Sequence, residues 1–171
     1  MYKLTIAFLL LFITSFVSSQ NRSIPIDTMI VTKHSTTING SKVGYTATAG
    51  MQPVWDKDGL PIASLFYTYY TRNNIKNRAT RPLIISFNGG PGSASVWMHV
   101  AYTGPRILNV DSEGYPVQPY GFKNNPNSIL DVADIVYINP VNTGYSRPVV
   151  NKGEKLDKSK FFGINADVQY L

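Results

Sequence analysis

The 171-residue chain contains no cysteine and only two histidines, and just 15% of its residues are charged. Small secreted domains often depend on disulfides, and this chain cannot form any, so its stability must come from an ordinary apolar core. A hydrophobic content of 43% allows such a core. No residues have the spacing of a metal site, and no glycine loop precedes a long helix as in phosphate-binding proteins. The sequence therefore predicts neither a metal nor a cofactor.

The positive charge of the chain is spread out rather than gathered into a patch. The formal net charge is +6, but the one basic run, at residues 152–160, is interrupted by Glu154 and Asp157. Such a run is typical of a solvated surface. Because the sequence also lacks zinc-finger, RNA-binding and helix-turn-helix signatures, it predicts no nucleic-acid partner.

The sequence has no apolar run long enough to cross a bilayer comfortably. Residues 4–17 are mostly apolar, follow Lys3 and precede Ser18 and Ser19. A charged start, a short apolar stretch and small residues are the pattern of a signal peptide. We expect cleavage after Ser19, no stable membrane anchor afterwards, and export to the periplasm or the extracellular space. An uncleaved anchor is the alternative. The expected domains are thus a signal peptide at 1–19 and one domain at 20–171.

Antiparallel strands are expected first in the mature chain. Asn-Gly at positions 39–40 lies between strand-like residues 36–38 and 43–49, and this dipeptide is a strong hairpin signal. A turn at 56–59 then leads into a strand at 62–71, which is rich in β-branched and aromatic residues.

Two buried strands are expected next, at 83–87 and 135–138. A short helix at 93–102, an ordered loop at 103–127 and a helical turn starting at Ser128 separate them, so the two strands should run parallel.

Both strands end in loops rich in Gly, Asn and Pro, at 88–92 and 139–146. In open α/β sheets ligands bind at the carboxyl ends of strands. Asn165 is expected to cap a final helix at 166–171, and because this helix carries no stop signal we expect the chain to be part of a longer protein.

The loop at 88–92 reads Asn-Gly-Gly-Pro-Gly. Glycines let backbone N–H groups approach a ligand closely, and Pro91 stiffens the loop. Rigid N–H donors at the end of a strand are what an oxyanion hole requires. A plain tight turn is the alternative interpretation.

The order of strand, glycine loop, helix, strand and Gly-x-Ser loop resembles the α/β-hydrolase fold, and more narrowly the serine carboxypeptidases. The segments at 87–95, 125–128 and 139–146 are similar to three motifs of that family, in the same order. Ser93 stands where the family has cysteine, Ile129 where it has tryptophan, and Asn142 where it has glycine. The substitutions look most like bacterial members. The predicted fold class is therefore the N-terminal portion of an α/β-hydrolase domain, a meander leading into a parallel sheet.

The resemblance implies roles for three residues. Gly90 matches the glycine whose backbone N–H serves the oxyanion hole, Asn88 matches the asparagine that hydrogen-bonds the substrate's terminal carboxylate, and Gly89 shapes the approach. The catalytic Ser, Asp and His would all follow Leu171.

Other candidate catalytic residues have structural interpretations. Ser146 lies in a segment that lacks the second glycine of Gly-x-Ser-x-Gly, which indicates a structural serine. The two histidines, His34 and His99, are expected to be surface or packed residues.

The predicted function is an exported serine carboxypeptidase that acts on peptides with a free C-terminus. A proline iminopeptidase or an esterase is one alternative, but these tend to carry His before Gly-Gly, where this chain has Asn88. A non-catalytic binding or structural remnant is another. The reading frame beyond Leu171 would distinguish them.

Overall fold

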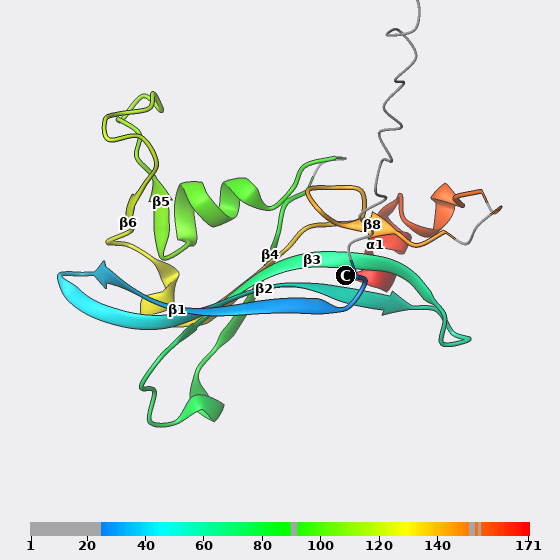
Figure 1. Cartoon of the computed structure of the whole chain (residues 1–171), viewed down its shortest axis with the longest axis horizontal. Coiled ribbons are helices and arrows are strands. Elements are labelled where there is room, and N and C mark those ends of the chain that lie inside the picture. The colour runs from blue at the N-terminus through cyan, green and yellow to red at the C-terminus, as the bar shows by residue number, and fades with distance from the viewer. Residues whose placement is uncertain (1–24, 90–91, 151–152, 154) are drawn as a thin grey trace, which may run out of the picture.

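The computed structural model describes residues 25–89, 92–150, 153 and 155–171. The predicted signal peptide and Gly90 lie outside these residues. A curved sheet forms the centre of the molecule, with strand order β1-β2-β3-β7-β4 and the short β8 (Arg147–Pro148) paired to β3 (Figure 1).

The first three strands form an antiparallel meander: β1 (Thr28–Ile38), β2 (Ser41–Trp55) and β3 (Pro61–Arg72). The predicted hairpin is confirmed, since Asn39 and Gly40 both have positive φ, 47° and 76°, as a type I′ turn requires. β1 is longer than predicted. It pairs with β2 along its whole length although most of its side chains are exposed, including the apolar Met29, Ile30 and Val31, so its start shows no alternation of buried and exposed residues.

The predicted parallel pair is also confirmed. β4 (Leu83–Phe87) and β7 (Asp134–Ile138) lie side by side and run in the same direction. The carboxylate of Asp134, 6% exposed, fixes the start of this pair by accepting hydrogen bonds from Arg81 Nε at 2.7 Å and Arg78 Nη1 at 2.9 Å.

The prediction that both strands are buried was wrong for β4. Leu83, Ile85 and Phe87 are 54%, 57% and 51% exposed. β4 is an edge strand of the sheet, and within the described residues this face of β4 is left open. β7 is buried on the face that carries Ile135 and Tyr137 and only half-buried on the other.

The connection between β4 and β7 contains more structure than predicted. A π-helix, η2 (Met98–Thr103), begins later than the expected helix because Ser93 and Ser95 are held in loop contacts. The region expected to be a loop contains a hairpin, β5 (Arg106–Leu108) with β6 (Phe122–Asn124). Figure 1 shows this hairpin beside η2, at the end of the molecule opposite α1.

Short helices complete the chain. η1 (Arg78–Thr80) precedes β4, and η3 (Ile129–Asp131) begins at the predicted position. η4 (Lys158–Lys160) and α1 (Ile164–Tyr170) follow β8. The cap predicted at Asn165 was wrong: the N-cap is Gly163, whose φ of 130° disfavours residues with a side chain.

The aromatic rings of Phe161 and Tyr170 pack 6.0 Å apart. Together with Ala63, Leu65 and Val141 they form a buried core beneath the sheet end. This core places α1 next to the loops that follow β4 and β7.

Candidate functional site

Two loops meet at one edge of the sheet. The glycine loop, residues 88–95, follows β4, and the second loop, residues 139–146, follows β7. Because β4 and β7 are parallel neighbours, their carboxyl ends coincide, which is where ligands bind in open α/β sheets. The predicted convergence of the two loops is therefore observed.

Asn88 stands at the start of the glycine loop with its side chain half-buried. Its Nδ2 atom donates a hydrogen bond to the hydroxyl of Ser93. An amide nitrogen carries two N–H groups, so this bond orients the side chain and leaves it a second donor. Ser93 stands where the carboxypeptidases have cysteine, and here its hydroxyl gives Asn88 a partner.

A cavity of about 420 Å³ opens beside these residues. Asn88 and Gly89 both line it, whereas Gly90 falls outside the described part of the chain. The remaining wall comes from the second loop, α1 and the segment that joins η4 to α1; its lining includes Pro140, Val141, Thr143, Phe161, Phe162, Ile164, Asp167 and Tyr170. A mostly apolar wall with a few placed polar groups is typical of a substrate pocket.

The polar groups on the α1 side of the cavity are Asp167 and Tyr170. The Tyr170 hydroxyl donates to Asp167 Oδ1 at 2.8 Å. Burial, and then the neighbouring Asp167 carboxylate, raises the pKa of Tyr170 to about 12. Tyr170 is therefore a neutral donor at physiological pH.

Ser95 connects the glycine loop to the end of β7. Its hydroxyl accepts the backbone N–H of Asn88 at 3.0 Å and donates to the carbonyl of Ile138. Its own backbone N–H donates to Asn139 Oδ1 at 3.0 Å. Sequence reasoning missed both contacts, although Ser95 falls inside the motif at 87–95 and Asn139 inside the motif at 139–146.

Ser146 is structural, as the sequence indicated. It is fully buried, accepts the backbone N–H of Phe66 at 2.8 Å and donates to the carbonyl of Asn139 at 2.6 Å. Both of its hydrogen-bonding directions face the backbone, so the hydroxyl is not available as a nucleophile.

The histidines are also placed as expected. His34 is exposed and stacks on Tyr45. His99, on η2, stacks on Tyr137 with ring centroids 4.6 Å apart and bonds the Tyr70 hydroxyl at 2.6 Å. Burial lowers the pKa of His99 to about 4. It is a packed, neutral histidine.

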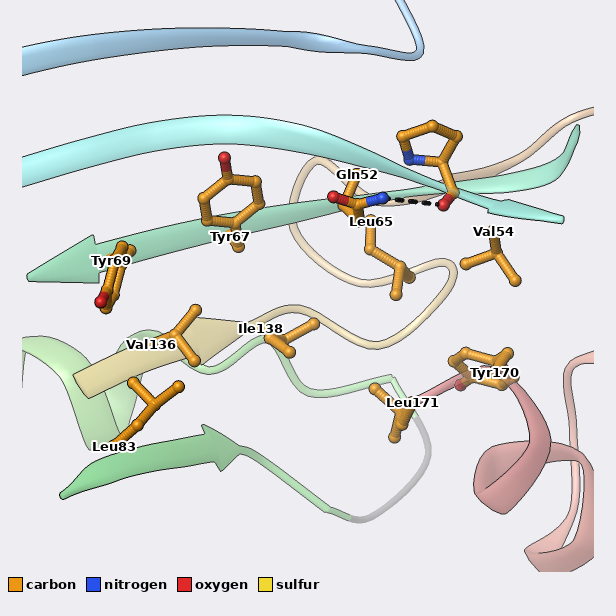
Figure 2. Close-up of a pocket in the computed structure, with 11 residues that line it drawn as sticks. Gln52, Val54, Leu65, Tyr67, Tyr69, Leu83, Val136, Ile138, Tyr170 and Leu171 are labelled. Carbon is orange, nitrogen blue, oxygen red and sulfur yellow. Dashed lines mark hydrogen bonds between the residues drawn. The ribbon is translucent and has the colours of Figure 1, made fainter. Parts of the chain in front are cut away.

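A second cavity lies on the open face of the sheet. This apolar groove, of about 530 Å³, is lined by residues of β2, β3, β4, β7 and α1: Gln52, Pro53, Val54, Leu65, Tyr67, Tyr69, Leu83, Val136, Ile138, Tyr170 and Leu171. Figure 2 shows Leu83, Val136 and Ile138 on adjacent strands, with Leu171 at one end. Apart from Gln52 and the tyrosine hydroxyls it offers little chemistry, so the glycine-loop cavity is the better candidate site.

No helix among the described residues is long and apolar enough to cross a membrane.

Comparison with known proteins identifies relatives for this arrangement. The model of the serine carboxypeptidase family matches residues 42–161, more than half of the chain. The pheromone-processing carboxypeptidase KEX1 of Saccharomyces cerevisiae is 33% identical over 97 residues, which is 56% of this chain and 12% of that protein. Serine carboxypeptidase-like 36 of Arabidopsis thaliana is 34% identical over 99 residues, 57% of this chain and 19% of the relative.

A solved structure is similar as well. The crystal structure of the prohormone-processing carboxypeptidase KEX1(Δ)p from S. cerevisiae aligns at 30% identity over 67% of this chain and 23% of that one, with a TM-score of 0.49. The matched part of this chain spans a fifth or less of the length of these curated relatives. They come from a yeast and a plant, so the expected affinity to bacterial members stays a prediction.

The family match covers the glycine loop, the second loop and the parallel β4–β7 pair. It confirms the predicted α/β-hydrolase fold class, since the observed sheet runs from an antiparallel meander into a parallel pair. The chain belongs to the serine carboxypeptidase family.

Proposed function

We propose that this chain is the N-terminal part of an exported serine carboxypeptidase that releases C-terminal residues from peptides through an acyl-enzyme. Family membership supports the reaction class. The observation that carries the proposal is the Asn88 amide on the wall of the glycine-loop cavity, beside the end of a parallel strand.

In this proposal Asn88 binds the terminal carboxylate of the substrate. Its second amide N–H is a neutral donor, which can hold a carboxylate and still release the product. Gly89 lines the cavity, and a Cβ added there would meet nothing within 4 Å, so a side chain at this position would extend into open space that the substrate is proposed to use. Gly90 supplies a backbone N–H to the oxyanion as negative charge develops on the scissile carbonyl.

The nucleophile and its partners are proposed to follow Leu171, in the family order Ser, Asp, His. The sequence contains no Gly-x-Ser-x-Gly, and Ser146 is committed to the backbone. The chain matches only 12% and 19% of the length of two relatives, which supports the same proposal. Export rests on the signal-like residues 1–19.

The test uses the protein expressed from its complete reading frame, with Asn88→Ala beside the wild type. Losing a hydrogen bond to a charged group costs about 1.5–3 kcal/mol, so kcat/KM should fall roughly ten- to a few-hundredfold on blocked dipeptides with a free C-terminal acid. The matching amide and ester, which have no carboxylate, should lose little. Equal losses on acid and amide would show that Asn88 only shapes the loop.

A further inference from the structure

Two buried serines flank the carboxyl end of β7, one on each side. Ser95 is 1% exposed and Ser146 is fully buried. Ser146 accepts the backbone N–H of Phe66, within β3, and Ser95 accepts that of Asn88, directly after β4; each hydroxyl donates to a carbonyl at the end of β7. The two carbonyls belong to consecutive residues, Ile138 and Asn139.

The hydroxyls link β7 to both of its neighbours at the place where the strand pairing of β7 ends. β7 lies between β3 and β4 in the sheet. Ser146 bridges Phe66 of β3 to the end of β7, and Ser95 bridges Asn88, directly after β4, to the same end. A hydroxyl between two backbone groups lets the strands separate while every N–H and C=O keeps a partner. This matters because an unpaired buried polar group costs about 1–3 kcal/mol.

Ser95, unlike Ser146, also links η2 to the two loops through its backbone. Its backbone N–H donates to Asn139 Oδ1 at 3.0 Å, and its carbonyl accepts the N–H of His99 at 3.1 Å, where η2 begins. Ser95 therefore joins the glycine loop, the second loop and η2 at one buried point. The Ser146 hydroxyl joins β3 to the second loop only.

We propose that Ser95 is a positioning residue for the carboxylate-binding end of the site: by holding the Asn88 backbone against the end of β7, it aims the Asn88 amide into the cavity. This inference rests on the proposed function for its effect on catalysis. Its structural half, the restraint on the Asn88 backbone, stands on the hydrogen bonds alone.

The test compares three variants of the complete protein. Ser95→Ala removes the hydroxyl that accepts the Asn88 N–H. Ser146→Ala is the matched control, since it removes an equally buried hydroxyl with the same pattern of partners on the other side of β7. Ser95→Thr keeps a hydroxyl and tests rescue. For each variant we would measure thermal stability, hydrogen exchange at the backbone N–H of Asn88, and kcat and KM on acid and amide substrates.

We expect both alanine variants to lose thermal stability. Only Ser95→Ala should speed hydrogen exchange at the backbone N–H of Asn88, by about tenfold or more. Only this variant should also reduce the preference for the free-acid substrate over the amide substrate, by about tenfold and mainly through KM. Ser95→Thr should restore the protection of the Asn88 backbone N–H against exchange, even if its extra methyl lowers the melting temperature.

Two results would overturn the inference. One is an unchanged rate of hydrogen exchange at the backbone N–H of Asn88 in Ser95→Ala. The other is an equal effect of Ser95→Ala and Ser146→Ala on that exchange and on the preference for the acid, which would indicate a general loss of stability. A third result separates the two proposals: the wild-type protein shows no preference for the acid substrate, but only Ser95→Ala speeds exchange at the Asn88 backbone N–H. That result would contradict the proposed function and still support the structural role of Ser95.

Discussion

Gly144 shows how one residue without a side chain can hold the second loop in place. Its φ is 49°, and a Cβ added there would lie 2.1 Å from Nδ2 of Asn139. The same Asn139 accepts the Ser95 backbone N–H through Oδ1. A side chain at position 144 would therefore push away the amide that ties the two loops together.

Gly144→Ala should destabilise the protein by more than its backbone conformation alone explains. Left-handed backbone costs a non-glycine residue roughly 1–2 kcal/mol, and displacing Asn139 adds about 1 kcal/mol for the lost hydrogen bond. Gly59→Ala is the matched control, because Gly59 has a φ of 76° and nothing within 4 Å of its added Cβ. Urea unfolding of both variants measures the difference. Equal losses would mean that the loop accommodates the methyl without moving Asn139.

At this scale a short motif in the sequence pointed to Asn88 and Gly89 as candidates, and both line the cavity; their binding roles stay predictions. It could not identify Ser95 and Asn139 as partners. A serine or an asparagine can bond many nearby backbone groups, and the actual partner depends on where the parallel strands end in space.

At the scale of elements, η2 is held on the sheet by an aromatic cluster around His99. The ring stacks on Tyr137 of β7 and bonds Tyr70 of β3. The backbone N–H of Gly104 closes the helix by donating to the His99 carbonyl at 3.0 Å, and an added Cβ at position 104 would lie 2.3 Å from that oxygen. η2 begins two residues after the glycine loop, so this packing also restrains where that loop ends.

This packing predicts a stability that depends on pH. Burial lowers the pKa of His99 to about 4 from an ordinary 6.5, so the unfolded chain binds a proton more readily than the folded one between these values. The stability gained by keeping His99 neutral is fully present above pH 6.5. As the pH falls towards 4, the free energy of unfolding drops by up to about 3 kcal/mol from this residue.

Unfolding free energies of wild type and His99→Gln, measured in urea from pH 7 to 4, test this. Glutamine can accept the Tyr70 hydroxyl bond but does not titrate, so the decline should be shallower in the variant by that amount. Parallel profiles for the two proteins would show that His99 is charged, or solvated, in the folded state.

Elements were predictable where pattern and turn chemistry agree. Asn39-Gly40 specified the first hairpin, and the apolar run 83–87 coincides with β4. β5 and β6 were missed because Gly, Pro and Asn dominate their region. The exposed start of β1 was missed because it is held by backbone pairing rather than by buried side chains.

At the scale of the whole molecule, one prediction concerns the proposed signal peptide at residues 1–19. A run of mostly apolar residues at 4–17 followed by Ser18 and Ser19 predicts cleavage after Ser19. Exported protein should therefore begin at Gln20 when its N-terminus is sequenced. Material that still begins at Met1 and stays in the membrane fraction would indicate an uncleaved anchor.

The open face of the sheet leads to the last prediction. Leu83 of β4 is 54% exposed and lines the apolar groove with Val136 and Ile138 of β7 (Figure 2). β4 is also an edge strand, and open edges beside apolar faces promote association. The 171-residue chain by itself should thus bind a hydrophobic dye, associate as its concentration rises, and fail to hydrolyse blocked dipeptides.

Leu83→Lys should reduce both dye binding and association, because it places a charge in the groove and beside the open edge. Val132→Lys is the control: Val132 is 65% exposed, but it follows η3 and does not line the groove. Light scattering across a concentration series and dye fluorescence measure the two effects. If both substitutions reduced association equally, general surface hydrophobicity would be the cause. If only Leu83→Lys did, the groove and the β4 edge would be the surface through which the chains associate, and the apolar side chains on the open face of β4 would be the cause.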